Sequence, residues 1–291
     1  MVSAPAAPRL LVDGVEAARV PADDRGLLYG DGVFRTVRVV GGAPWLWSAH
    51  LAKLLHDADA IGMPVDEALE ACVVEDVRRI VATDDGVLRI TLTRGSGPRG
   101  YAPPARPAPR RVLSFAAGPL PGLRGGAVRL QLARTPLALT PALAGLKHLG
   151  RLEQVLACDE PAEPDVFDRL MLDPEGTVVC GSRCNLFLRV GRRLLTPAVD
   201  RAGVAGVVRD TVLGGRIPGA TAWVDETQEV RVGLDDLARA DELFVTNAVF
   251  GVRAVSSVLD VEGRELAAPR SGVGLAATLG EGFVRLTGEA A

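Results

Sequence analysis

The segment GLKHLGRLEQVLA, residues 145–157, contains Lys147, one of only two lysines in the chain. The other is Lys53, and because lysine and arginine together number 33, the remaining 31 of these cations are arginines. Arginine readily replaces lysine as a surface cation but not as an amine nucleophile, because a guanidinium group stays protonated. A lysine retained against this bias indicates Schiff-base chemistry. The alternative, from the residues alone, is a lysine that extends from a helix end into solvent.

Composition places the chain among ordinary globular proteins. Its 291 residues are 48% hydrophobic and 24% charged, and the net charge of −3 gives no basic surface for nucleic acid. Apolar stretches are too short to span a membrane, and the N-terminus lacks an export signal, so we expect a cytoplasmic protein. Four cysteines without CxxC spacing and only three histidines predict free thiols and no metal site.

The pattern of the first 118 residues predicts a small α/β lobe. Alternation from Val33 to Val39 indicates a strand, and Ser48 is a candidate N-cap for a helix whose leucines recur at helical spacing. A second helix is expected at about 66–82. Two further strands are expected in GVLRITLTRGSG (86–97) and RRVLSFAA (110–117).

Residues 119–126, rich in glycine and proline, are the predicted linker to a larger α/β lobe at 127–291 that carries Lys147. We expect its elements to be a strand near 127–133, a helix after Lys147, a hairpin from FDRLMLD to TVVCG, a strand in DELFVTNAV and a C-terminal helix. The segment GVAGVVRDTVLGG predicts a glycine-rich turn that opens a helix. Backbone N–H groups at such a point attract an anion, which singles out Gly206, Val207 and Val208.

Six segments in order resemble one enzyme family over residues 9–260. They are DRGLLYGDGVFRTVRV, SAHLAKLLHDA, RGSGPRGY, LKHLGRLEQVLA, GVAGVVRD and DELFVTNAV. Together they resemble the 4-amino-4-deoxychorismate lyases of the class IV aminotransferase family. The resemblance implies the two-lobed fold type IV of pyridoxal 5′-phosphate (PLP) enzymes, similar to D-amino acid aminotransferase, together with PLP as cofactor, a small-molecule substrate and a homodimer.

The resemblance also implies roles for individual residues. Lys147 would attach the cofactor and move the substrate proton, with help from the Thr36 hydroxyl. Arg94, Arg99 and Tyr101 would meet the substrate carboxylates. The residues expected to contact the cofactor are Lys53, Lys147, Cys180, Gly206, Val207, Val208, Asn247 and Ala248.

Two of these positions depart from the family pattern. Lys53 stands where an arginine usually contacts the cofactor phosphate, and lysine lacks the bidentate fork. Cys180 stands where a glutamate usually keeps the ring nitrogen protonated, and a thiol with a pKa of about 8.5 is mostly neutral. The ring is then a poorer electron sink. We expect this to cost transamination more than an elimination that expels its leaving group soon after proton removal.

The expected function is therefore the elimination of pyruvate from 4-amino-4-deoxychorismate to give 4-aminobenzoate, in a folate or aminobenzoate-derived pathway. Two alternatives stay open at this stage. One is a class IV amino-acid aminotransferase, and the other is a divergent member that has lost normal PLP catalysis, as Lys53 and Cys180 together suggest.

Overall fold

The computed structural model describes residues 7–123, 125–215, 217–269 and 274–287. The chain forms two compact units, which divide between Leu120 and Pro121, inside the predicted linker. Lys147–Gly150 belong to unit 1, although the sequence assigned Lys147 to the second lobe. The reason is that backbone hydrogen bonds join this short segment to a strand of unit 1, whereas the residues on either side of it belong to unit 2.

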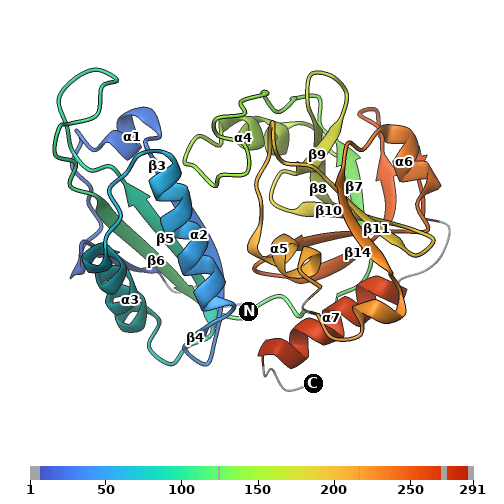
Figure 1. Ribbon diagram of the computed structural model, residues 1–291, viewed down its shortest axis with the longest axis horizontal. Helices are drawn as coiled ribbons and strands as arrows, with labels where there is room; N and C mark the ends of the chain where they lie inside the picture. Colours follow the sequence, from blue (N-terminus) through green and yellow to red (C-terminus); the bar gives the residue numbers. More distant parts are fainter. Residues whose placement is uncertain (1–6, 124, 216, 270–273, 288–291) are drawn as a thin grey trace. The chain divides into compact units, whose positions relative to one another are not determined.

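Unit 1 is built on a six-stranded antiparallel sheet in the order β2-β1-β6-β5-β3-β4 (Figure 1). The strands predicted at 33–39, 86–97 and 110–117 are β3, β5 and β6. The strand bounds are β1 (Arg9–Val12), β2 (Val15–Glu16), β3 (Gly32–Val40), β4 (Ala43–Pro44), β5 (Gly86–Thr93) and β6 (Arg110–Ala117). A short helix, α1 (Arg25–Tyr29), precedes β3.

Two longer helices, α2 (Trp47–Ala60) and α3 (Glu67–Val81), bury their apolar faces against this sheet. α3 begins as predicted, because the Asp66 side chain accepts the Leu69 N–H at 2.8 Å. The predicted Ser48 cap of α2 is wrong: the N-cap is Leu46, in the left-handed conformation. The Leu46 carbonyl already accepts the His50 N–H, and this bond starts the helix before Ser48.

Unit 2 contains a nine-stranded mixed sheet in the order β12-β11-β10-β13-β14-β7-β8-β9, with β15 paired to β14. The pairs β11–β12, β14–β7 and β7–β8 are parallel, and the others are antiparallel. The bounds are β7 (Val128–Leu132), β8 (Val166–Leu172), β9 (Val178–Gly181), β10 (Asn185–Val190), β11 (Arg193–Pro197), β12 (Glu226–Val230), β13 (Glu242–Asn247), β14 (Gly251–Leu259) and β15 (Glu265–Ala267).

The helices of unit 2 lie around this sheet (Figure 1). They are α4 (Leu152–Asp159), α5 (Val207–Leu213), α6 (Leu234–Arg239), α7 (Gly274–Thr287) and a single 3₁₀ turn, η1 (Ala220–Ala222). α5 packs against β13, and α7 packs against both β13 and β14. These contacts place α5 beside β13, the strand that ends at Asn247. Within the described residues, no helix has the length and the apolar run needed to cross a membrane.

Candidate functional site

The segment that carries Lys147 pairs with the beginning of β3. The Phe34 N–H donates to the Lys147 carbonyl at 2.9 Å, and the Leu149 N–H donates to the Gly32 carbonyl at 2.9 Å. These two bonds flank an antiparallel bridge between Val33 and His148. The backbone of Lys147 is therefore held by a strand more than a hundred residues earlier in the sequence.

A buried carboxylate holds the other side of the Lys147 backbone. The Lys147 N–H donates to Oδ2 of Asp57 at 2.8 Å, and the same carboxylate pairs with the guanidinium of Arg35. Arg35 and Asp57 are only 2% and 1% exposed. Sequence reasoning missed both residues. The available signal was a charged residue at an inward position in each apolar pattern, Arg35 within β3 and Asp57 within α2.

The ammonium of Lys147 lies over an aromatic ring. Its Nζ is 4.6 Å from the centre of the Phe34 ring, within the range of a cation–π interaction. Because side chains alternate along a strand, Phe34 and Thr36 share one face of β3 and Arg35 takes the opposite face. The structure thus brings Lys147 and Thr36, the two predicted catalytic residues, to the same face of the sheet in unit 1.

Positive charge gathers around His50 on α2. This ring is 3% exposed, and among the described residues neither of its nitrogens has a hydrogen-bond partner. Burial, followed by the charges of Arg35, Lys147 and Lys53, lowers the pKa of His50 to about 3. Lys53, predicted to meet a phosphate, therefore lies in a region of unit 1 whose cations suit an anionic ligand.

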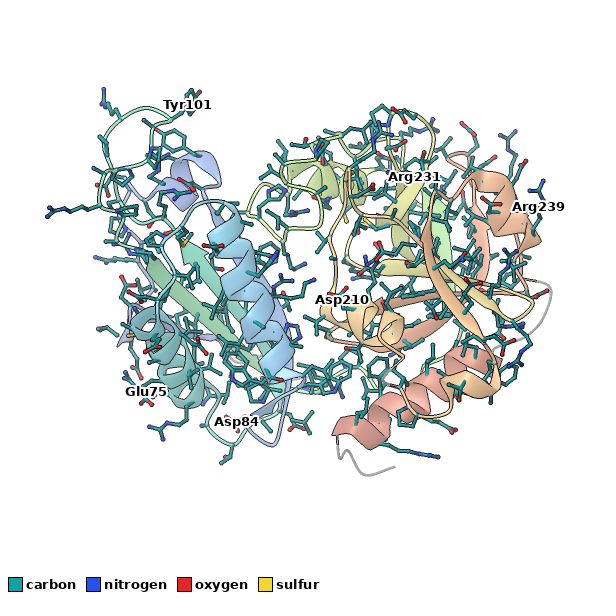
Figure 2. The ribbon with its side chains drawn as sticks, in the orientation of Figure 1. Glu75, Asp84, Tyr101, Asp210, Arg231 and Arg239 are labelled. Atoms are coloured by element: carbon teal, nitrogen blue, oxygen red, sulfur yellow. The ribbon has the colours of Figure 1, made fainter. Side chains whose placement is uncertain are left out.

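The three predicted substrate residues lie in one loop of unit 1 but in different environments. Arg94 is buried, and its nitrogens donate to Asp31, to the Ile61 carbonyl at 2.7 Å and to the Gly62 carbonyl at 2.6 Å. Arg99 is exposed, and Tyr101 is 87% exposed at the outer end of the loop (Figure 2). Arg94 thus donates to oxygen atoms of the protein itself, whereas Arg99 and Tyr101 face solvent.

A buried arginine at the start of α1 holds this loop. The Arg25 guanidinium donates to the carbonyls of Gly100, Tyr101 and Ala102 at 3.1, 2.8 and 3.2 Å, and its Nε donates to Asp31 at 2.8 Å. Asp31 is also the partner of Arg94, so one carboxylate joins both arginines. The backbone of the loop is fixed although the Tyr101 side chain extends outward.

In unit 2, the predicted phosphate segment forms the beginning of α5. Gly206 is the N-cap, and in the described part of the chain no side chain caps this helix. A Cβ built at Gly206 would overlap Oδ1 of Asn185, whose Nδ2 donates to the Val204 carbonyl at 2.8 Å. Val207 and Val208 are buried in the first turn. A larger residue at 206 would have to displace the Asn185 side chain, and among the described residues no side chain occupies the first N–H groups of α5.

The end of β13 has an ordered turn. Oδ1 of Asn247 accepts the N–H groups of Val249 and Phe250, each at 2.9 Å, so the side chain of Asn247 shapes the turn through Ala248. Preceding it, Thr246 is fully buried, and its hydroxyl finds no hydrogen-bond partner within the described ranges. A buried hydroxyl without a partner costs free energy, so this position suits an additional acceptor.

Cys180 lies in a small apolar cluster at the end of β9. It is 5% exposed, and its Sγ is 3.7 Å from where a Cβ on Gly203 would be. Nearby Cys184 donates to Asp168 at 2.9 Å, and burial, followed by the Asp168 charge, raises the pKa of the Cys184 thiol well above its ordinary value. All four cysteines carry free thiols, as predicted.

The structure therefore distributes the predicted residues over both units. Unit 1 contains Lys147, Thr36, Lys53 and the loop with Arg94, Arg99 and Tyr101, and unit 2 contains Cys180, Gly206, Val207, Val208, Asn247 and Ala248. The first group presents an amine with cations around it. The second presents backbone N–H groups and a buried thiol.

Comparison with known proteins relates this chain to one family. The family described as amino-transferase class IV matches residues 32–258. An aminodeoxychorismate lyase of Vibrio harveyi is 32% identical over 260 residues, which cover 85% of this chain and 90% of that protein. A putative branched-chain-amino-acid aminotransferase of Methanocaldococcus jannaschii is also 32% identical, over 254 residues that cover 85% of this chain and 84% of that protein.

The fold has a close counterpart among solved structures. The crystal structure of 4-amino-4-deoxychorismate lyase from Pseudomonas aeruginosa matches with a TM-score of 0.82 and 38% sequence identity. The match covers 95% of this chain and 98% of that chain. The similarity thus extends through both units.

Proposed function

Because the chain belongs to the amino-transferase class IV family, we propose that it is a lyase that eliminates pyruvate from 4-amino-4-deoxychorismate and releases 4-aminobenzoate. Fold type IV and the cofactor PLP, both expected from the resemblance, are confirmed by the family match. The observation that carries the choice of reaction is the shared face of β3: the Lys147 ammonium lies over Phe34, and Thr36 is the next side chain on that face.

The residues present fit the cofactor. PLP has an anionic phosphate and an aldehyde, which require cations or N–H donors and an amine. The cations around His50 meet the first requirement in unit 1, and the start of α5, which no side chain of the described residues caps, meets it in unit 2. From the family resemblance we assign phosphate contacts to Lys53 within unit 1 and to Gly206, Val207, Val208, Asn247 and Ala248 within unit 2, and we assign the aldehyde to Lys147.

When bound, PLP supplies an electron-accepting ring conjugated to the amino group of the substrate. The Lys147 amine then moves the proton that the substrate loses, and the Thr36 hydroxyl on the same face orients that exchange. Arg99 and Tyr101, exposed on their loop, meet the substrate carboxylates, and Arg94 contributes by holding the loop to Asp31. By the family resemblance, Cys180 would stand beside the ring nitrogen, where a thiol would support its protonation less than a carboxylate does, and an elimination with an early departure of the leaving group would tolerate this.

The direct test is product formation. Purified protein supplied with PLP is incubated with 4-amino-4-deoxychorismate, and pyruvate and 4-aminobenzoate are measured without any added keto acid. We expect equal amounts of both products. Amino transfer from an amino acid to a keto acid, with no aminobenzoate formed, would overturn the proposal in favour of an amino-acid aminotransferase. That second candidate function is supported by the Methanocaldococcus jannaschii relative, because its sequence identity to this chain, 32%, equals that of the Vibrio harveyi lyase.

The family resemblance extends the proposal to the setting of the reaction. We place the enzyme in a folate or aminobenzoate-derived pathway, in the cytoplasm and as a homodimer. Analytical ultracentrifugation of the PLP-loaded protein tests the dimer.

A further inference from the structure

We propose that Asp57 is a positioning residue for Lys147: its carboxylate, held by Arg35, fixes the main chain of Lys147 so that the amine stays over Phe34. The inference rests on the proposed function of Lys147 in attaching the cofactor. It concerns residues that all lie in unit 1.

The hydrogen bond from Lys147 to Asp57 replaces a bond that the local pairing would otherwise make. Around the Val33–His148 bridge, the Phe34 N–H donates to the Lys147 carbonyl. The next bond of an antiparallel ladder would run from the Lys147 N–H back to the Phe34 carbonyl. The Lys147 N–H donates instead to Oδ2 of Asp57 at 2.8 Å. The ladder therefore ends at Lys147, and the carboxylate determines the direction in which the chain continues.

The carboxylate is itself held from two sides. Asp57 lies in the last turn of α2, and the guanidinium of Arg35 pairs with it from the facing strand. The same guanidinium donates to the Lys53 carbonyl on α2 at 3.1 Å. The position of the Asp57 carboxylate is consequently set by α2 and β3 rather than by the short segment at 147–150.

This arrangement differs from a buried ion pair that serves the fold alone. Such a pair contributes little net stability compared with apolar residues in its place, because desolvation offsets the attraction, although removing one partner alone is destabilising. Unit 1 contains such a pair for comparison: Asp76 on α3 accepts from Arg111 on β6 at 2.7 Å, and Asp76 is 3% exposed. Both pairs join a helix carboxylate to a strand arginine, but the one at Asp57 also accepts the N–H of Lys147.

The test follows exchange of the Lys147 amide with deuterium in the full-length, cofactor-free protein. Asp57→Ala removes the acceptor, and loss of one ordinary hydrogen bond is expected to speed exchange about tenfold. Asp57→Asn keeps a side-chain oxygen and is expected to restore slow exchange. Asp76→Ala is the matched control, expected to lower thermal stability while the Lys147 amide exchanges as in the wild type. If Asp57→Ala does not fold, Asp57→Ser is used under the same criteria.

A second measurement links the contact to the cofactor. The proteins are loaded with PLP and reduced with borohydride, and the fraction of Lys147 peptide that carries the cofactor is measured by mass spectrometry. Asp57→Ala is expected to lower this fraction, and Asp76→Ala to leave it unchanged. Equal amide exchange in Asp57→Ala and Asp76→Ala would overturn the inference. A wild-type protein whose Lys147 takes up no PLP would overturn the proposed function instead, while the exchange result still decides the role of Asp57.

Discussion

Phe34 and Lys147 contact each other twice: the Phe34 N–H donates to the Lys147 carbonyl at 2.9 Å, and the Phe34 ring lies 4.6 Å from Nζ of Lys147. One strand residue thus holds the main chain of the lysine and also lies against its charged group. Thr36 follows on the same face of β3, so its side chain and the Phe34 ring that the amine contacts lie on one side of the sheet.

Replacing Lys147 with arginine separates charge from nucleophilicity. Lys147→Arg keeps a cation over Phe34, so we expect the fold to persist, but a guanidinium cannot attach the cofactor. Turnover is expected to fall about 10³-fold, the scale of a lost general base. Borohydride reduction followed by mass spectrometry should find no cofactor on the peptide that contains residue 147. Covalent capture at another residue would contradict the assignment.

Lys53→Arg restores the side chain that the family usually has. A guanidinium donates two parallel hydrogen bonds to a phosphate, so PLP should bind several-fold more tightly than to the wild type. Lys53→Gln removes the charge and should release PLP faster. Equilibrium dialysis of the three proteins is expected to rank them arginine, lysine, glutamine in decreasing affinity. Indistinguishable affinities would remove Lys53 from the phosphate site.

Cys180→Glu tests the account of the ring nitrogen. A carboxylate at this buried position should keep the nitrogen protonated and favour amino transfer more than elimination. A gain of about tenfold in amino transfer would correspond to about 1.4 kcal/mol of transition-state stabilisation. Cys180→Gln is the neutral control of similar shape and should give no gain. Equal effects of glutamate and glutamine would refute the proposed pairing.

Gly206→Ala probes the start of α5. Its Cβ would overlap Oδ1 of Asn185, so we expect a loss of about 1–3 kcal/mol in the free energy of unfolding and weaker PLP binding. Gly233→Ala is the matched control, because Gly233 is also a helix N-cap and a Cβ there would lie 3.6 Å from Asp236. Urea denaturation and PLP titration measure both effects. Similar results for the two variants would argue against a special role of Gly206.

His50 predicts a pH dependence of stability. Its pKa is about 3 in the folded protein and 6.5 in the unfolded chain, so the unfolded state takes up a proton first as the pH falls. The contribution of His50 to the free energy of unfolding should therefore decrease as the pH falls below about 6.5, by about 2 kcal/mol between pH 7 and pH 5. His50→Gln should remove this dependence. His56→Gln, on the same helix but with a side chain 72% exposed, should keep it when unfolding is followed in urea at each pH.

Local pattern was sufficient to predict several elements of the fold. The strand predicted at 33–39 is β3, and the helix predicted at about 66–82 is α3. The predicted Ser48 cap failed because the chain leaves the β3–β4 hairpin and enters α2 through Leu46, in the left-handed conformation. A capping residue acts over three or four positions, whereas the start of α2 depends on where β4 ends.

The chemistry of the site was visible in the sequence to the extent that it depends on residue type. A lysine kept among 31 arginines, a glycine opening a helix and a cysteine in place of a glutamate are all properties of single positions. They predicted which groups have unusual chemistry. They did not predict what holds those groups in place, or that Arg94 would donate to Asp31 and to two backbone carbonyls.

Only the tertiary structure decided the surroundings of Lys147. Asp57 lies 90 positions away in sequence, and its carboxylate meets the Lys147 N–H because α2 packs on the face of β3 that carries Arg35. Periodicity determines which face of an element is buried, since burying apolar surface lowers the free energy of any such element. Which partner each buried polar group finds depends on how distant elements pack together, and no local stretch of the sequence contains that information.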